Sequence, residues 1–303
     1  MSRRGRTESG ADMPRYTPRR VSPYVLLGVA SLVAIAVALA GMAFWPGSSD
    51  PPRPPQAAST AVPLRDPHAL TGRTIVLDPG HNGGNGAAGS AINRLVDAGG
   101  FQKECDTAGA ETDAGYPEHA FTFDVATRAA GLLRSRGATV ILTRNDDTGV
   151  GPCVDERARI GNAAGAEAVV SIHADGGPSE GSGFHVIAPA ASPDGGNGGI
   201  LTASARLADL LRGTFGAATG QRRADYLGDD GITVRSDLGG LNLSRVPKVF
   251  LECGNMHNPG DAGRISDAAW RQRAAEGIVD GLAAFLVSAP SGASTGVARP
   301  ATG

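Results

Sequence analysis

The stretch IVLDPGH, residues 75–81, decides how the rest of the chain is interpreted. Its apolar first half is typical of a buried β-strand, and the Pro-Gly pair ends that strand just before a histidine. Two later segments repeat the arrangement, since residues 168–172 lead into His173 and residues 249–251 lead into Glu252. Ligands of open α/β sheets bind beyond the carboxyl ends of the strands. The pattern therefore predicts that two imidazoles and a carboxylate meet at one place.

The charge distribution of the 303-residue chain indicates whether its globular part could bind nucleic acid. Residues 1–20 contain six Arg against Glu8 and Asp12, a net charge of +4, so the remainder carries −6 to give the formal total of −2. A domain with this acidic balance has no basic footprint for nucleic acid. We therefore exclude nucleic acid as a partner of the globular part.

The N-terminal region predicts that the globular domain lies outside the cytoplasm. Residues 24–45 are free of charged side chains and are long enough to span a bilayer, which takes roughly 20 apolar residues. Arginines precede this segment and place residues 1–23 in the cytoplasm by the positive-inside rule. We expect an uncleaved transmembrane anchor, in a single-pass protein of the cell membrane. A cleaved signal peptide and a secreted protein are the alternative, because residues 38–40 and 41–43 offer small-residue cleavage sites.

Strands and helices alternate within one globular domain. Residues 46–69 are rich in Pro and Ser and predict an extended linker, while residues 288–303 predict a disordered tail. The remaining residues, 70–287, predict a three-layer α/β domain. The expected strands are 74–77, 139–142, 168–173, 183–188, 232–234 and 249–252, and the expected helices are 117–136, 154–164, 200–218 and one from residue 267.

Residues 82–117 form a long segment rich in Gly, Ala and Asp between the first strand and the first helix. A loop of this length in a compact domain is usually functional or has structure of its own. Its Gly-rich start, residues 82–86, lacks the Gly-Lys-Ser/Thr ending of a phosphate-binding loop. We interpret that start as a flexible turn.

Glu118 opens the first expected helix on the same stripe as Phe121 and Val125, which face the sheet. An ionised carboxylate on a buried face is costly unless it is paired or bound to a metal. A glutamate near a helix N-terminus more often stays in water and favours the helix dipole. Because histidines are expected at the neighbouring strand ends, we favour the buried position for Glu118.

The chain has three cysteines, at positions 105, 153 and 253. In an exported protein an even pair forms a disulfide. We pair Cys105 with Cys153, because both lie in expected loops, and this bridge would tether the segment 82–117. Cys253 follows a buried strand, and we expect a small core residue there rather than a nucleophile.

The polar residues at the strand ends suit a metal-dependent hydrolysis. Catalytic zinc takes three protein ligands from His and carboxylates and keeps a fourth position for water, whose pKa it lowers to about 7. His81, Glu118 and His173 are the candidate ligands, and Glu252 is the candidate for proton transfer to a leaving amine. Spacing alone is a weak signal, because the ligands are scattered along the chain and lack the HExxH pattern.

A series of short motifs narrows the class further: DPGH at 78–81, Glu118, LTR at 142–144, Arg157 with Asn162, SIHAD at 171–175 and Leu-Glu at 251–252. In this order they resemble the zinc-dependent N-acetylmuramoyl-L-alanine amidases of the amidase-3 type, most closely the actinobacterial members. The resemblance covers residues 73–287. It implies a twisted sheet of about six strands flanked by helices, zinc bound by His81, Glu118 and His173, and Glu252 as the catalytic residue.

The resemblance also implies a function. The expected enzyme is a peptidoglycan hydrolase of the autolysin type, which uses zinc-activated water to cleave the amide bond between the lactyl group of N-acetylmuramic acid and L-alanine of the stem peptide. Its partners would be peptidoglycan, the membrane and a protein activator. The segment 82–117 is longer than in a minimal family member, and it either covers the zinc until an activator binds or shapes the groove.

Two alternatives stay open at this stage: another exported zinc amide hydrolase, such as a wall peptidase, and a catalytically weak wall-binding or regulatory module. The other histidines of the domain are expected to be less important for either. His119 points about 100° away from Glu118 around the helix and is expected in solvent. His185 is expected to be structural, and His257 is a candidate for the groove.

Overall fold

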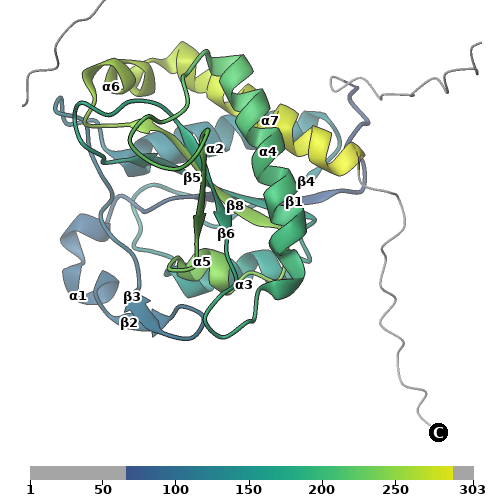
Figure 1. The fold of residues 1–303 in the computed structure, drawn as a ribbon, viewed down its shortest axis with the longest axis horizontal. Helices are drawn as coiled ribbons and strands as arrows, with labels where there is room; N and C mark the ends of the chain where they lie inside the picture. The colour runs from purple at the N-terminus through teal and green to yellow at the C-terminus, as the bar shows by residue number, and fades with distance from the viewer. Residues whose placement is uncertain (1–65, 289–303) are drawn as a thin grey trace, which may run out of the picture. The chain divides into compact units, whose positions relative to one another are not determined.

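The computed structural model describes residues 66–288, and the expected three-layer α/β architecture is confirmed there. One six-stranded sheet has the order β4-β1-β5-β8-β6-β7, and its strands β5, β8 and β6 run through the middle of the domain in Figure 1. Neighbouring strands are parallel except for the pair β6 and β8. The carboxyl ends of the three central strands therefore lie at one edge of the sheet. The strands are β1 (Thr74–Pro79), β4 (Thr139–Leu142), β5 (Ala168–Asp175), β6 (His185–Pro189), β7 (Ile232–Arg235) and β8 (Lys248–Asn255).

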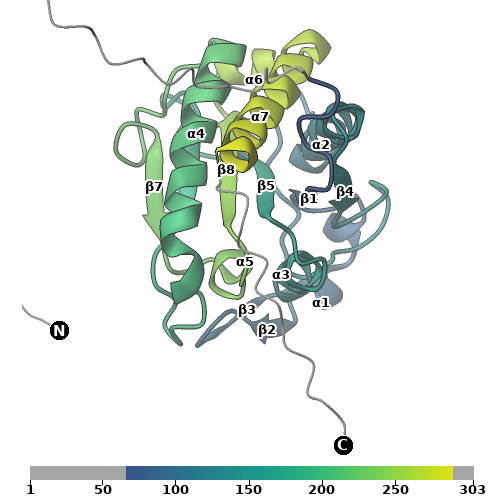
Figure 2. The ribbon, with the colours of Figure 1, turned by 90° about the vertical axis from the view of Figure 1, so that its right-hand side faces the viewer.

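Helices cover both faces of this sheet. The main core lies under three long helices, and Figure 2 shows two of them, α4 and α7, side by side across the strands. The opposite face has a smaller core beneath α3, together with the short helix α5. The helices are α2 (Glu118–Ser135), α3 (Val154–Ala163), α4 (Leu201–Thr219), α5 (Gly239–Asn242), α6 (Pro259–Ser266) and α7 (Ala268–Val287).

Alternation along β5 explains how one strand serves the core and the site together. Successive side chains of a strand point to opposite faces of the sheet. Val170 and Ile172 are fully buried in the main core under the long helices. Ser171 and His173 alternate with them in sequence and border a cavity on the other face, with residues of α3 and α5. The apolar side chains therefore anchor β5 in the main core, and its polar side chains lie on the opposite face of the sheet.

The segment between β1 and α2 has structure of its own. It contains a 3-10 turn η1 (Asn85–Ala87), a short helix α1 (Gly89–Ile92) and an antiparallel hairpin of β2 (Leu95–Asp97) and β3 (Gln102–Glu104).

The Gly-rich start of this segment is packed, which the expectation of a flexible turn missed. Asn82 donates a hydrogen bond to the Gly151 carbonyl oxygen at 2.9 Å, and the Gly151 amide donates to Asn85 at 2.8 Å. A side chain at Gly83 would overlap the carbonyl oxygen of Asp147. Glycine is required here because two backbone segments approach closely.

The N-terminal predictions lie mostly outside the described residues. The cytoplasmic residues 1–23, the membrane segment 24–45, most of the linker and the C-terminal tail belong to the parts that the structure does not describe. Within residues 66–288, no helix combines the length and the apolar character needed to cross a bilayer. Residues 66–69, assigned to the linker from sequence, form a turn that leads into the buried Leu70.

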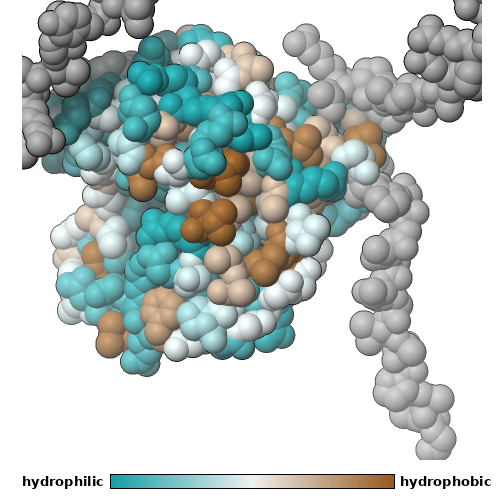
Figure 3. Space-filling model, in the orientation of Figure 1, coloured by the Kyte–Doolittle hydropathy of each residue, from teal (hydrophilic) through white to brown (hydrophobic). Residues whose placement is uncertain are grey.

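The surface over α4 and β7 is mixed in character. On the face shown in Figure 3, hydrophobic residues are interspersed with hydrophilic ones. Among the described residues, the large apolar side chains that are exposed are Leu95, Val150, Leu227 and Val234. Isolated apolar residues of this kind are normal on a water-facing surface and identify no interface.

Candidate metal centre and active site

Three of the side chains singled out in the sequence converge at the sheet edge. His81 follows β1, Glu118 opens α2 and His173 lies in β5, and one donor atom from each lies within 4.8 Å of the others. The Glu118 carboxylate lies between the rings, with Oε2 3.3 Å from Nε2 of His81 and Oε1 3.0 Å from Nδ1 of His173. Glu118 is only 4% exposed, so the buried position expected for it is present.

The backbone around these side chains is adapted to bring them together. His81 has a φ of 57°, a left-handed conformation that is uncommon for residues other than glycine and that concentrates at functional sites. Gly80 lies so close to His173 that a side chain there would overlap the imidazole ring. From the 82–117 segment, the Ala110 amide donates a hydrogen bond to Oε2 of Glu118 at 2.8 Å. Contacts from the sheet, from α2 and from the 82–117 segment therefore hold these three side chains in place.

Glu252 lies on the strand beside His173. The register of β5 and β8 pairs these two residues directly, and Glu252 is also paired with His185 of β6. Burial, together with the nearby carboxylates of Glu118 and Asp175, raises the pKa of Glu252 well above its usual value. His81, Glu118, His173 and Glu252 are called the imidazole–carboxylate cluster below.

The electrostatics of this cluster favour positive charge beside Glu118. Burial opposes ionisation of His81, but the carboxylates of Glu118 and Asp106 raise its pKa to about 10. Burial likewise opposes ionisation of Glu118, while the two imidazoles lower its pKa well below the usual value. A buried carboxylate that is stabilised by neighbouring positive charge is also suited to a metal cation.

A second buried group lies beneath the first and has its own cations. Oδ1 of Asp78 accepts from Thr143 at 2.7 Å and from Arg157 at 2.9 Å. Oδ2 accepts from Ser171 at 2.9 Å and from Lys248 at 3.0 Å. Burial alone would raise the pKa of Asp78, but Lys248 and Arg157 lower it far below its usual value. These five residues are called the ion-pair cluster below.

A small cavity adjoins the two imidazoles. Its volume is about 160 Å³, and its walls include His81, His173, Asp106, Leu238 and Phe250. The Phe250 ring stacks on His173 with a centroid distance of 5.0 Å and an interplanar angle of 15°. The exposed lining of this cavity is largely apolar and could take a small non-polar group of a substrate.

The cysteines behave as the sequence indicates. Cys105 and Cys153 form a disulfide that joins the 82–117 segment to the start of α3. Cys253 is a free thiol, fully buried in the main core, and burial raises its pKa well above the usual value. A neutral thiol in an apolar core is a poor nucleophile, which supports the structural role expected for Cys253.

The other histidines lie outside the three-donor group. His119 was expected in solvent, but its Nδ1 lies 2.8 Å from Asp147. His185 is 1% exposed, and its Nδ1 lies 3.0 Å from the Thr233 hydroxyl, in keeping with a structural position. His257 is exposed and its Nδ1 lies 3.1 Å from the Gly177 carbonyl oxygen.

Two acidic residues near the site were given no role from the sequence, although Asp175 ends the SIHAD motif. Asp175 follows His173 by two positions in β5, so both belong to the same face, and its Oδ2 accepts from the Tyr226 hydroxyl at 3.2 Å. Period-two spacing could have identified Asp175. Asp106 lies 3.0 Å from Nδ1 of His81, and nothing in the irregular 82–117 segment indicated that contact.

Two imidazoles from the strand ends and a buried carboxylate from α2 form a group that could hold a metal ion, with ligand types that catalytic zinc sites use. The family model for N-acetylmuramoyl-L-alanine amidases, Amidase_3, matches residues 75–284. The chain belongs to this family, as the resemblance in its motifs implied.

Relatives that are named as N-acetylmuramoyl-L-alanine amidases align with nearly the whole domain. The chain is 42% identical over 223 residues to N-acetylmuramoyl-L-alanine amidase Rv3717 of Mycobacterium tuberculosis, an alignment that covers 73% of this chain and 90% of the relative. The crystal structure of the amidase Ami1 from Mycobacterium smegmatis matches with a TM-score of 0.68 and 42% identity, over 73% of this chain and 99% of that one. Apo Ami1 from Mycobacterium abscessus matches with a TM-score of 0.67 and 43% identity, over 72% and 100%.

Proposed function

We propose that this amidase hydrolyses the bond between the lactyl group of N-acetylmuramic acid and L-alanine of the peptidoglycan stem peptide, with zinc bound by His81, Glu118 and His173. The observation that carries the proposal is the convergence of the three donor atoms within 4.8 Å, with Glu252 in register beside His173. Family membership and relatives named for this activity support the choice of substrate.

The residues present fit a zinc ion. Two imidazoles and one carboxylate form a ligand set that catalytic zinc sites use. Nδ1 of His81 faces Asp106 and leaves Nε2 directed towards Glu118, so the two ring nitrogens have different partners. When bound, zinc supplies a Lewis acid that polarises a carbonyl oxygen and activates water near neutral pH.

Glu252 is assigned to proton transfer. A general base works best when its pKa lies near the operating pH, and burial with two neighbouring carboxylates raises the pKa of Glu252 in that direction. Its carboxylate would take the proton from the attacking water and deliver it to the nitrogen of the departing L-alanine. The adjoining cavity of about 160 Å³ would hold a small apolar group of the substrate while this transfer takes place.

The proposed place of action is outside the cytoplasm, on the cell wall. A disulfide between Cys105 and Cys153 is typical of proteins in oxidising compartments. The uncharged residues 24–45 support a membrane anchor, or a signal segment if they are removed.

Digestion of purified sacculi tests the function. We expect the zinc-loaded chain to release free stem peptides that begin with L-alanine and to leave the glycan strands intact. Removal of the metal with a chelator should abolish release, and added zinc should restore it. Cut cross-links with uncut lactyl–alanine bonds would identify a wall peptidase instead, and sacculus binding without any product would identify a wall-binding module.

A further inference from the structure

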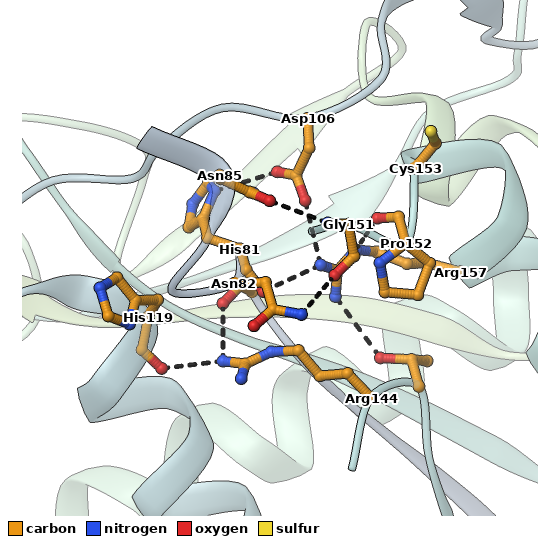
Figure 4. Close-up of polar contacts among 12 residues, drawn as sticks. His81, Asn82, Asn85, Asp106, His119, Arg144, Gly151, Pro152, Cys153 and Arg157 are labelled. Carbon is orange, nitrogen blue, oxygen red and sulfur yellow. Dashed lines mark hydrogen bonds and ion pairs between the residues drawn. The ribbon is translucent and has the colours of Figure 1, made fainter. Parts of the chain in front are cut away.

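Asp106 lies behind one of the proposed ligands and in contact with it. Its Oδ1 is 3.0 Å from Nδ1 of His81, the ring nitrogen on the far side from Glu118. Figure 4 shows the Asp106 carboxylate between the His81 ring and the guanidinium of Arg157, whose Nη2 donates to Oδ2 at 3.0 Å. Asp106 is 7% exposed, so this arrangement is largely shielded from water.

The position of Asp106 depends on the neighbouring disulfide. Asp106 directly follows Cys105, which is bonded to Cys153 at the N-terminal end of α3. The Val154 amide donates to the carbonyl oxygen of Cys105 at 2.8 Å, so the backbone is fixed at the same point. The segment that carries Asp106 is therefore fastened to α3, the helix that carries Arg157.

We propose that Asp106 is a positioning residue for His81 and that the Cys105–Cys153 disulfide holds it there, so that the affinity for zinc depends on the disulfide. This inference rests on the zinc site of the proposed function. Asp106 is assigned no contact with the reacting atoms, and it acts through the ring of His81.

The physical reason is the fixed orientation of the imidazole. A carboxylate that accepts from Nδ1–H selects the tautomer in which Nε2 is free to bind a metal, and it holds the ring plane. The Thr107 carbonyl oxygen, 3.1 Å from Nδ1 of His81, offers a weaker alternative acceptor. Loss of Asp106 should therefore weaken zinc binding rather than abolish it.

The alternative is that Asp106 only stabilises the fold by pairing with Arg157, and this alternative predicts a different result. Arg157 also donates to Asp78, at 2.9 Å, and to the carbonyl oxygens of Pro79 and His81, at 2.7 and 3.0 Å. These bonds keep the guanidinium in place without Asp106. If Asp106 served only Arg157, its replacement would change the stability of the metal-free protein and leave the zinc affinity unchanged.

The test is zinc affinity measured on the full chain by competition with a chromogenic chelator, alongside thermal unfolding of the metal-free protein. Asp106→Ala should bind zinc about 10–100-fold more weakly than the unaltered chain, the usual cost of losing a group behind a ligand. Asp106→Asn keeps an oxygen that accepts from Nδ1 and should recover most of that affinity. Asp113→Ala removes an exposed carboxylate of the same segment and should bind zinc normally.

The disulfide is tested by replacing both cysteines, Cys105→Ser with Cys153→Ser, which avoids free thiols that would bind zinc themselves. This variant should also lose zinc affinity, by about 10-fold on the same scale. Adding Asp106→Ala to it should cost little more, because the two changes disturb one arrangement and are not additive.

The outcomes separate this inference from the proposed function. Normal zinc affinity in Asp106→Ala, or equal losses in Asp106→Ala and Asp106→Asn, would overturn the positioning role while the zinc site stands. Fully additive losses would overturn the role of the disulfide. An unaltered chain that binds no zinc would remove the proposed metal site, and the inference with it.

Discussion

Two buried polar clusters lie next to each other in this domain, and they differ in how their charges are balanced. In the ion-pair cluster, Asp78 faces Lys248 and Arg157, and its pKa is lowered far below the usual value. In the imidazole–carboxylate cluster, the pKa of Glu252 is raised because the residue is buried and because carboxylates are its neighbours. The first cluster contains the cations that it needs, whereas the second depends on protons or on a metal ion.

This difference assigns the clusters to different tasks. A buried ion pair with every hydrogen bond made is costly to break, because the remaining charge is left without a partner. A group of carboxylates and imidazoles with shifted pKa values is typical of a catalytic or metal site. The ion-pair cluster also positions the second one, since Arg157 donates to the carbonyl oxygens of Pro79 and His81.

The largest expected effect is the loss of a proposed ligand. In His173→Ala, zinc affinity should fall by more than about 100-fold, because even residues behind a ligand cost about 10–100-fold. Hydrolysis of sacculi should fall to background with it. His68→Ala, which changes an exposed histidine in the turn before β1, is the matched control and should retain both properties. Unchanged zinc content in His173→Ala would remove it from the ligand set.

Breaking the ion-pair cluster should affect stability most. Asp78→Asn leaves Lys248 without its buried counter-charge and removes one of the two carboxylates that pair with Arg157. It should lower the free energy of unfolding by about 3–5 kcal/mol, measured by urea denaturation. Asp280→Asn is the control, because it breaks the partly exposed pair with Arg136 and should cost less than about 1 kcal/mol. Equal effects of the two changes would contradict the structural role assigned to Asp78.

Acid should reduce the difference between Asp78→Asn and the unaltered chain. The pKa of Asp78 is lower in the folded state than its unfolded value of about 3.9, so its contribution is complete above that value. It is lost as the pH falls through the folded-state pKa. The difference between the denaturation midpoints should therefore begin to shrink below about pH 4 and should be smaller at pH 2 than at pH 7. A difference that stays constant over this range would show that Asp78 is not stabilised as an anion.

The fold was predictable where local patterns and burial agree. The strand expected at 139–142 has the observed bounds, and helix α2 begins at Glu118 as the apolar stripe indicated. Helix α6 was missed although its signal is present: Asn258 caps it, accepting from the amides of Gly260 and Asp261, and Pro259 is its first residue. A helix of this length has too few apolar positions to show a period.

The site was predictable only where residues stand at the ends of regular elements. His81 lies just after the apolar strand β1, and His173 lies near the end of the apolar strand β5. Their positions therefore follow from the position of these strands in the sheet. Lys248 opens β8 and looks like a surface residue in the sequence, yet it is buried because it pairs with Asp78, 170 positions away. Asp106 lies in a segment without a period. Contacts of this kind depend on the tertiary fold, which the local pattern does not specify.

The most direct test of the central claim is to measure zinc content and hydrolysis together in Glu252→Gln. The claim is that three side chains hold the metal while a fourth, Glu252, moves the proton. We therefore expect one zinc per chain, as in the unaltered protein, and release of stem peptides from sacculi that is slower by about 10²–10⁴-fold. Undiminished hydrolysis, or loss of the zinc together with the activity, would contradict this division of roles.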